Sequence, residues 1–138
     1  MADKVRLRLV TPSRLLLDEE VDEVTAPGVL GEFGVLPKHI SFLTLLEVGE
    51  MVYKQGGERH QLAVGGGYAE VLDDEMTVLA NAAEYADEID IERARKARER
   101  AEKRMAELSR EDKDFAAADA ALRRALVRLS IASKEARK

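Results

Sequence analysis

The stretch MVYKQGGERHQLAV, residues 51–64, decides the fold of the first part of the chain. Two segments rich in apolar residues flank Gln55-Gly56-Gly57. Paired glycines supply the positive φ angles that a tight turn between antiparallel strands requires. We therefore expect a β-hairpin here, with one strand near residues 51–53 and the other near residues 60–64.

Similar short segments lie on both sides of this hairpin. Residues 4–9 alternate between charged and apolar side chains, which is typical of a half-buried strand. Further strands are expected near residues 15–17, 21–25, 42–46, 68–72 and 76–80. We interpret Gly65-Gly66-Gly67 as a tight connection between two of these strands. Many short strands separated by turn residues predict an antiparallel β-sandwich or barrel.

The remainder of the chain has a different period. All nine glycines lie at or before Gly67 and all three prolines lie before residue 40. Apolar side chains then recur at alternating spacings of three and four over residues 94–108 and again over residues 115–132, which predicts two amphipathic helices. The polar residues 109–112 separate them, and Asp90 suits the N-cap of the first. We expect an antiparallel helical hairpin with helices of about 19 and 21 residues.

Charge divides the chain at the same place. Residues 1–86 contain 7 basic and 15 acidic side chains, whereas residues 87–138 contain 15 basic and 12 acidic ones. The sequence thus predicts an α+β protein with a β-sandwich domain, residues 1–86, and a two-helix hairpin domain, residues 87–138. The alanine-rich faces of the helices bury little area, so we expect the hairpin to detach easily from whatever it packs against.

Composition excludes several classes of function. The 138 residues include no cysteine, which excludes disulfides, thiolate zinc sites and thiol nucleophiles. Two histidines and no tryptophan leave no recognisable catalytic set and no metal site, which disfavours a small hydrolase. The net charge of −5 disfavours nucleic acid as a partner. The charged start MADKVRLRLV does not fit a signal peptide, and no apolar run would span a bilayer, so we expect a soluble intracellular protein.

Two segments outside the core pattern are candidates for function. GEFGVLPKH, residues 31–39, predicts a fixed loop that directs Glu32 outward, although the residues alone favour a turn with an incidental acid. From residue 120 onward there is one acid, Glu135, and six bases: Arg123, Arg124, Arg128, Lys134, Arg137 and Lys138. This basic end fits either a docking element for an acidic partner or a solvated helix face.

Four arginines form a third candidate. Arg93 and Arg100 share one face of the first expected helix, and Arg124 and Arg128 share one face of the second. In a hairpin these pairs would converge, and an anion would then relieve their repulsion. The spacing alone favours the alternative, in which these arginines pair with the acids Glu92, Glu99 or Asp119.

Five motifs in order resemble one family along nearly the whole chain. They are GEFGVLPKH (31–39), LAVGGGYAEV (62–71), VLA (78–80), IDIERA (89–94) and LRRALVRLSIA (122–132). With these motifs the chain resembles the epsilon subunit of bacterial and chloroplast F-type ATP synthases. The homologous mitochondrial subunit, called delta there, is disfavoured because no Arg- and Ser-rich transit segment precedes the first strand.

The resemblance implies a non-catalytic rotor subunit of a proton- or sodium-translocating ATP synthase. It would rotate in the central stalk with the gamma subunit and the ring of c subunits. Glu32 matches the family position that meets the loops of the c ring, and His39 matches the histidine that faces gamma and the ring. Many relatives read Pro-Gly-His-Ala-Pro-Leu where residues 37–42 here read Pro-Lys-His-Ile-Ser-Phe. The protein would be a peripheral membrane protein on the cytoplasmic face of the bacterial inner membrane, attached only through the complex. A location at the chloroplast thylakoid is disfavoured.

The resemblance also implies regulation by the helical hairpin. In the family the hairpin either lies folded or extends along gamma, where its basic second helix approaches an acidic segment of the catalytic β subunit, within the αβ hexamer, and blocks ATP hydrolysis. The residues expected to dock there are Arg123, Arg124, Arg128 and Lys134.

Nucleotide-binding members of the family carry the motif I/L-D-x-x-R-A. Ile89, Asp90, Arg93 and Ala94 match it, and the further matches are Glu84, Arg100, Arg124 and Arg128. The resemblance thus implies a regulatory ATP between the helices, with the arginines toward its phosphates and Glu84, Ile89 and Asp90 toward its adenosine; no other cofactor is implied. An alternative function is a stand-alone nucleotide-sensing adaptor that signals through the hairpin.

Overall fold

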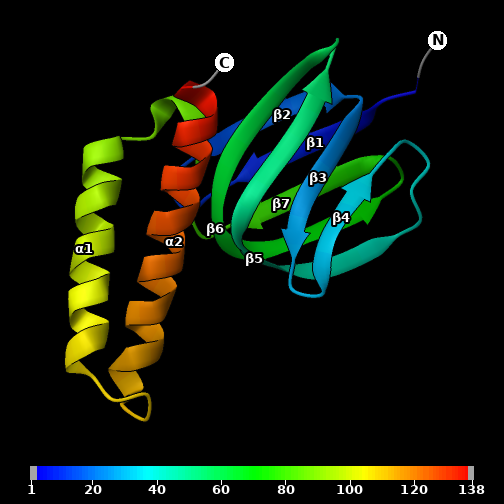
Figure 1. Ribbon diagram of the computed structural model, residues 1–138. Coiled ribbons are helices and arrows are strands. Elements are labelled where there is room, and N and C mark those ends of the chain that lie inside the picture. The colour runs from blue at the N-terminus through cyan, green and yellow to red at the C-terminus, as the bar shows by residue number, and fades with distance from the viewer. Residues whose placement is uncertain (1–2, 137–138) are drawn as a thin grey trace. The chain divides into compact units, whose positions relative to one another are not determined.

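The computed structural model describes residues 3–136 and divides into two compact units, Met1–Tyr85 and Ala86–Lys138 (Figure 1). Arg137 and Lys138, which belong to the basic end of the sequence, lie outside the described residues, and so does the side chain of Glu135. Each unit is described by itself.

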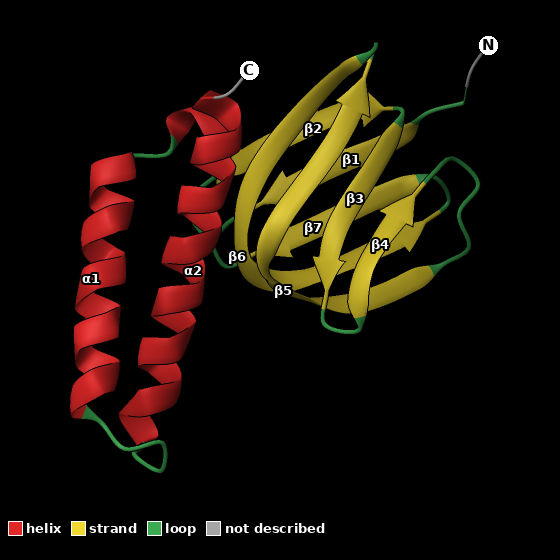
Figure 2. Ribbon diagram, viewed as in Figure 1, coloured by secondary structure: helices red, strands yellow, loops and turns green. Residues whose placement is uncertain are grey.

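The first unit is a β-sandwich, as the sequence predicts (Figure 2). Its strands are joined by hydrogen bonds in the order β2-β1-β7-β6-β5-β3-β4, and β8 pairs with β6. All of these pairs are antiparallel except β1 with β7, which run parallel. The strands are β1 (Val5–Val10), β2 (Leu15–Val21), β3 (Glu23–Gly28), β4 (Gly31–Val35), β5 (Phe42–Gln55), β6 (Glu58–Leu72), β7 (Glu75–Ala80) and β8 (Ala83–Tyr85).

Alternation along the strands builds the core of the sandwich. In β1, Val5, Leu7 and Leu9 are completely buried while the basic side chains between them face outward. Each buried leucine or valine stabilises the fold by about 1.5–3 kcal/mol through the removal of apolar surface from water. Other members of the core are Val24, Ala26, Met51, Leu62, Val64, Ala69, Met76 and Val78.

The hairpin at residues 51–64 is confirmed. Gln55 pairs with Glu58, and the two residues between them, Gly56 and Gly57, have φ angles of 58° and 86°. An L-residue with a side chain adopts such angles at a cost, which explains the two glycines. Asp22 supports this turn, since its carboxylate accepts a hydrogen bond of 3.0 Å from the backbone N–H of Gly56. The ion pair with Lys4 and this hydrogen bond lower the pKa of Asp22.

The predicted connection at Gly65-Gly66-Gly67 is wrong, because these glycines lie inside β6. Before them β6 pairs with β8 at residues 62–64, and from Gly67 to Leu72 it pairs with β7. The glycines therefore mark a kink at which one long strand changes its partner, a role that glycine also serves within sheets. The shorter strands expected at residues 60–64 and 68–72 are one strand, and those at 42–46 and 51–53 are both part of β5.

The second unit contains a short 3-10 helix η1 (Ala86–Glu88) and two helices, α1 (Ile91–Glu107) and α2 (Lys113–Ala136). The helices run side by side in opposite directions (Figure 1), which confirms the predicted hairpin. Asp90 is the N-cap of α1, as expected: its carboxylate accepts a hydrogen bond of 3.0 Å from the backbone N–H of Arg93. Leu108 and the polar residues 109–112 connect the helices, and the carboxylate of Asp112 accepts a hydrogen bond of 2.9 Å from the N–H of Asp114 at the start of α2.

Candidate functional site

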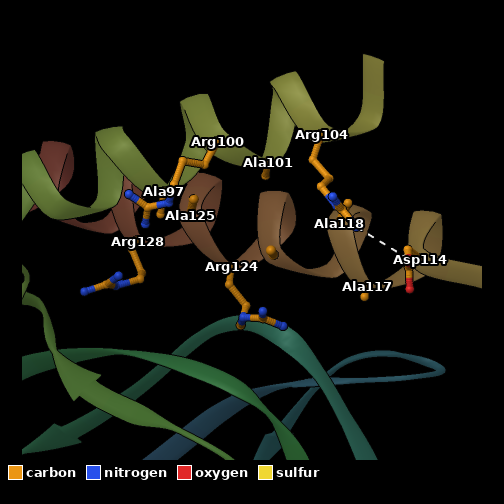
Figure 3. A pocket seen from close by; sticks show the side chains of 11 residues that line it. Ala97, Arg100, Ala101, Arg104, Asp114, Ala117, Ala118, Arg124, Ala125 and Arg128 are labelled. Carbon is orange, nitrogen blue, oxygen red and sulfur yellow. Dashed lines mark hydrogen bonds and ion pairs between the residues drawn. The ribbon is translucent and has the colours of Figure 1, made fainter. Parts of the chain in front are cut away.

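An open groove of about 480 Å³ lies between α1 and α2. Small side chains form its floor, because the alanine stripes of the two helices face each other there (Figure 3). Four guanidinium groups and one carboxylate are the charged groups that line it. The lining residues are Ala97, Arg100, Ala101, Arg104, Asp114, Ala117, Ala118, Ala121, Arg124, Ala125 and Arg128.

The arginines of the groove differ in their partners. Arg104 of α1 forms an ion pair of 3.4 Å with Asp114 of α2, near the connection between the helices. Within residues 3–136, neither Arg100 nor Arg124 has an ion-pair partner. Arg100 extends from α1 toward α2, whereas Arg124 and Arg128 point away from α1 (Figure 3). The groove therefore has an excess of positive charge, which suits an anionic ligand.

The groove brings together only some of the arginines singled out in the sequence. Arg100, Arg124 and Arg128 line it, but Arg93 does not. Two of the acids considered as partners pair within their own helices instead: Glu92 with Arg95, and Asp119 with Arg123 at 3.8 Å. Arg104 and Asp114 were not expected; Arg104 lies four residues after Arg100, so helical spacing alone would have placed it on the same face.

The other residues of the nucleotide motif have structural surroundings of their own. The carboxylate of Asp90 caps α1. Ile89 and Ala94 are buried, while Glu84 is a half-buried residue of β8 in the first unit. On α2, Arg123 and Lys134 of the basic set are exposed.

Glu32 lies in β4 rather than in a loop. Residues 31–35 form a strand paired with β3, in which Glu32 is opposite Pro27. The predicted loop at these positions is therefore wrong, because the hydrogen-bonding edge of β3 extends the sheet there. The side chain of Glu32 is exposed, as expected. It lies close to the two-residue turn at Val29-Leu30, where Leu30 is 96% exposed.

His39 lies in the segment between β4 and β5. Its Nδ1 is 2.6 Å from the carbonyl oxygen of Ile40, and since a carbonyl can only accept, Nδ1 carries the hydrogen. Its ring packs edge-on against Phe42 at 5.9 Å, and Phe42 packs against Phe33 at 5.2 Å. Lys38 has a φ of 67°, in the left-handed region that favours glycine.

An exposed apolar row that the sequence patterns do not predict crosses the outer face of the sandwich. Cross-strand pairing joins Leu45 to Tyr68, Tyr68 to Leu79, Leu79 to Val10 and Val10 to Leu15. We call these five residues the apolar row. Leu45 is 61% exposed, Tyr68 46% and Leu15 58%, and the other two are half-buried. Alternation in β5 gives a hint of it, since Leu43 and Leu45 face opposite to the core residue Leu46.

Two kinds of site are missing from the part of the chain that the structure describes. No group of three or more His, Asp or Glu side chains there would hold a metal ion. None of its helices combines the length and the apolar character needed to cross a bilayer.

Comparison with protein families accounts for both units. A family model described as the β-sandwich domain of the ATP synthase delta/epsilon chain matches residues 4–86, and a second one, the long α-helix domain of the same chain, matches residues 87–133. This chain belongs to the delta/epsilon family of ATP synthase subunits. The resemblance noted in the five sequence motifs is thus confirmed.

Similar epsilon chains match over the whole length. The ATP synthase epsilon chain of Geobacter sulfurreducens is 55% identical over 138 residues, which is 100% of both chains. That of Nitratidesulfovibrio vulgaris is 53% identical over 131 residues, covering 95% of this chain and 97% of the relative. These relatives are each named as one chain of the ATP synthase, which is consistent with a subunit that is not itself catalytic.

Solved structures show the same fold. A chain from the Euglena gracilis mitochondrial ATP synthase, in an assembly of OSCP, F1 and c-ring, has a TM-score of 0.78 and 26% identity, covering 98% of this chain and 82% of that one. A chain from the central stalk and c-ring of the Tetrahymena thermophila enzyme has a TM-score of 0.57 at 15% identity, which shows similarity of fold alone. The epsilon fold is therefore shared with chains of ATP synthase assemblies that include a c-ring.

Proposed function

We propose that this epsilon-family chain joins the gamma subunit to the c ring in the central stalk and inhibits ATP hydrolysis through a mobile helical hairpin. It carries out no chemistry itself. The first unit is the part that binds the rotor, and the second unit is the regulatory part. Its membrane association is peripheral and occurs only through the complex, on the cytoplasmic face of the inner membrane.

The apolar row is the observation that carries the rotor-binding role. Monomeric soluble proteins rarely expose contiguous apolar surface unless it binds something. Here five neighbouring strands each contribute one apolar side chain to a continuous row across the sheet. We assign this row to gamma. Glu32, near the turn at residues 29–30, is assigned to the polar loops of the c ring, and His39 to the border between the two partners.

Replacement of Leu45 and Tyr68 by serine tests this assignment. We expect the double variant to bind purified gamma subunit about 100-fold more weakly, because each exposed apolar side chain that becomes buried contributes about 1.5 kcal/mol. Titration calorimetry measures the affinity. The matched control is Ile91→Ser with Leu126→Ser, which removes two apolar side chains of similar exposure from the helices. Equal affinity of both variants and the parent would exclude the row as the gamma site.

The basic face of α2 supports the inhibitory role. Arg123, Arg124, Arg128 and Lys134 all lie on α2, and they suit an acidic segment of the catalytic β subunit. Alanine-lined contact between the helices buries little apolar surface, which is consistent with two hairpin positions that differ by a few kcal/mol. A partner or ligand shifts such an equilibrium only if it binds the two positions unequally.

A second function, binding of a regulatory ATP, is favoured by the groove between the helices. Arg100, Arg124 and Arg128 line it, and two of them have no ion pair within the described chain. ATP held there would stabilise the folded hairpin, since it would bridge both helices. The alternative function, a stand-alone nucleotide sensor, would use the same ATP site.

Titration of the isolated chain with ATP tests the nucleotide site. A micromolar dissociation constant supports sensing, whereas a millimolar constant or no binding excludes it at ordinary ligand concentrations. We expect Arg100→Ala to weaken binding about tenfold, because a charge-assisted contact to phosphate contributes about 1.5–3 kcal/mol. Lys96→Ala is the matched control, since Lys96 lies on α1 outside the groove.

A further inference from the structure

Lys38 has a backbone conformation that is unfavourable for lysine. Among residues 3–136, three residues other than glycine have a positive φ: Lys38, Asp73 and Asp74. The two aspartates form the turn between β6 and β7, and aspartate tolerates the left-handed region through its short polar side chain. Lysine lacks a short polar side chain of this kind, so the close approach of its Cβ to the backbone strains this conformation. Strain of this kind persists at sites where function requires it.

Contacts from a neighbouring turn hold the strained segment in place. The backbone N–H of Lys38 donates a hydrogen bond to the carboxylate of Asp74. The carbonyl of Asp74 in turn accepts a hydrogen bond of 2.8 Å from the N–H of Arg6 in β1. The N–H of His39 donates to the carbonyl of Leu36 at 3.2 Å, which closes the segment on itself. The conformation is therefore fixed by the sandwich and does not depend on the side chain of Lys38.

The side chain of Lys38 contributes little to the stability of the sandwich. It is 79% exposed, and its one ion pair with a described residue, 3.5 Å to Asp3, joins it to a side chain that is 59% exposed. Ion pairs as exposed as this one are worth little, because water and salt screen them. Glycine would fit the backbone better, so lysine at this position lowers the stability of the fold.

Two apolar side chains near Lys38 in the sequence, Leu36 and Ile40, are exposed. Leu36 is 56% exposed and Ile40 is 79% exposed, and each lies two residues from Lys38 in the sequence. Ile40 leads into β5, where Leu43 is 66% exposed and Leu45 begins the apolar row. Exposed apolar surface thus runs from this segment onto the face assigned to gamma.

We propose that residues 36–40 extend the gamma-binding surface and that Lys38 pairs there with a carboxylate of the gamma subunit. This inference rests on the proposed rotor function, because it names a contact within that interface. Burial of Leu36 and Ile40 in the same interface would exclude water near the ion pair, which makes it stronger than an exposed one.

Three variants of Lys38 separate this role from a structural one. Lys38→Gln keeps the side-chain stem and the backbone strain but removes the charge, and we expect it to bind purified gamma about tenfold more weakly. Lys38→Gly relieves the strain, so we expect its melting temperature to equal or exceed that of the parent while its affinity for gamma falls at least as far. Lys38→Arg retains the charge and is expected to bind within about threefold of the parent.

The measurements are gamma affinity by titration calorimetry at two salt concentrations, and the melting temperature of each variant. Weaker binding by Lys38→Gln, with a smaller salt dependence than the parent shows, supports the ion pair. Unchanged affinity in both Lys38→Gln and Lys38→Gly overturns it while leaving the apolar row as the gamma site. Failure of the parent chain itself to bind gamma overturns the proposed function and this inference together.

Discussion

Gly67→Ala is expected to lower the free energy of unfolding of the β-sandwich by about 4 kcal/mol or more. A Cβ on Gly67 would lie 2.1 Å from the carbonyl oxygen of Leu79 and 2.8 Å from the Cα of Ala80. Both are backbone atoms of the paired strand β7, so they cannot move aside as a side chain would. The φ of Gly67, 133°, adds backbone strain for any L-residue with a side chain. Steric overlap and strain each cost about 1–3 kcal/mol even in milder cases.

Denaturation by urea, followed by circular dichroism, measures this effect. The matched control is Gly34→Ala in β4, where the nearest atom to an added Cβ is the carbonyl oxygen of Val24 at 4.0 Å and φ is not positive. We expect the control to change stability by less than about 1 kcal/mol. Similar stabilities of the two variants would contradict the close approach of the β7 backbone to Gly67.

Local patterns in the sequence were sufficient for most elements of the fold. The turn at Gly56-Gly57, the alternation in residues 4–9 and the two helical stripes each depend on neighbours within a few residues. The N-cap role of Asp90 is equally local, since its partner is the backbone N–H of Arg93. Such features follow from turn chemistry, side-chain period and capping, which sequence displays directly.

Features that depend on distant partners could not be predicted. A run of glycines allows either a turn or a kink, and Gly65-Gly66-Gly67 forms a kink because β6 exchanges β8 for β7 there. The parallel pairing of β1 with β7 joins residues about 70 positions apart. The apolar row has the same origin, since each member comes from a different strand and only the register between strands aligns them.

The candidate sites were anticipated by residue type more than by position. Family motifs singled out Arg100, Arg124 and Arg128, and the structure places all three on one groove. The same motifs gave no sign that Arg93 would lie outside it or that Arg104 and Asp114 would pair across it. Which arginines face a groove depends on how two helices are rotated against each other, and their packing decides that.

Arg124→Ala combined with Arg128→Ala is expected to reduce inhibition of ATP hydrolysis by at least about tenfold in the reassembled ATP synthase. Both arginines lie on α2 and point away from α1 (Figure 3), and their positive charges suit an acidic surface. An ion pair that becomes desolvated in an interface contributes about 1.5 kcal/mol or more, and loss of 1.4 kcal/mol changes an equilibrium tenfold.

The measurement is the ATPase rate of a complex depleted of its epsilon subunit, titrated with each variant. Lys96→Ala with Lys103→Ala removes the same charge from exposed positions of α1 outside the groove, and we expect it to inhibit as the parent does. Full inhibition by the arginine variant would exclude docking through α2. Equal loss of inhibition in both variants would show that net charge alone causes the effect.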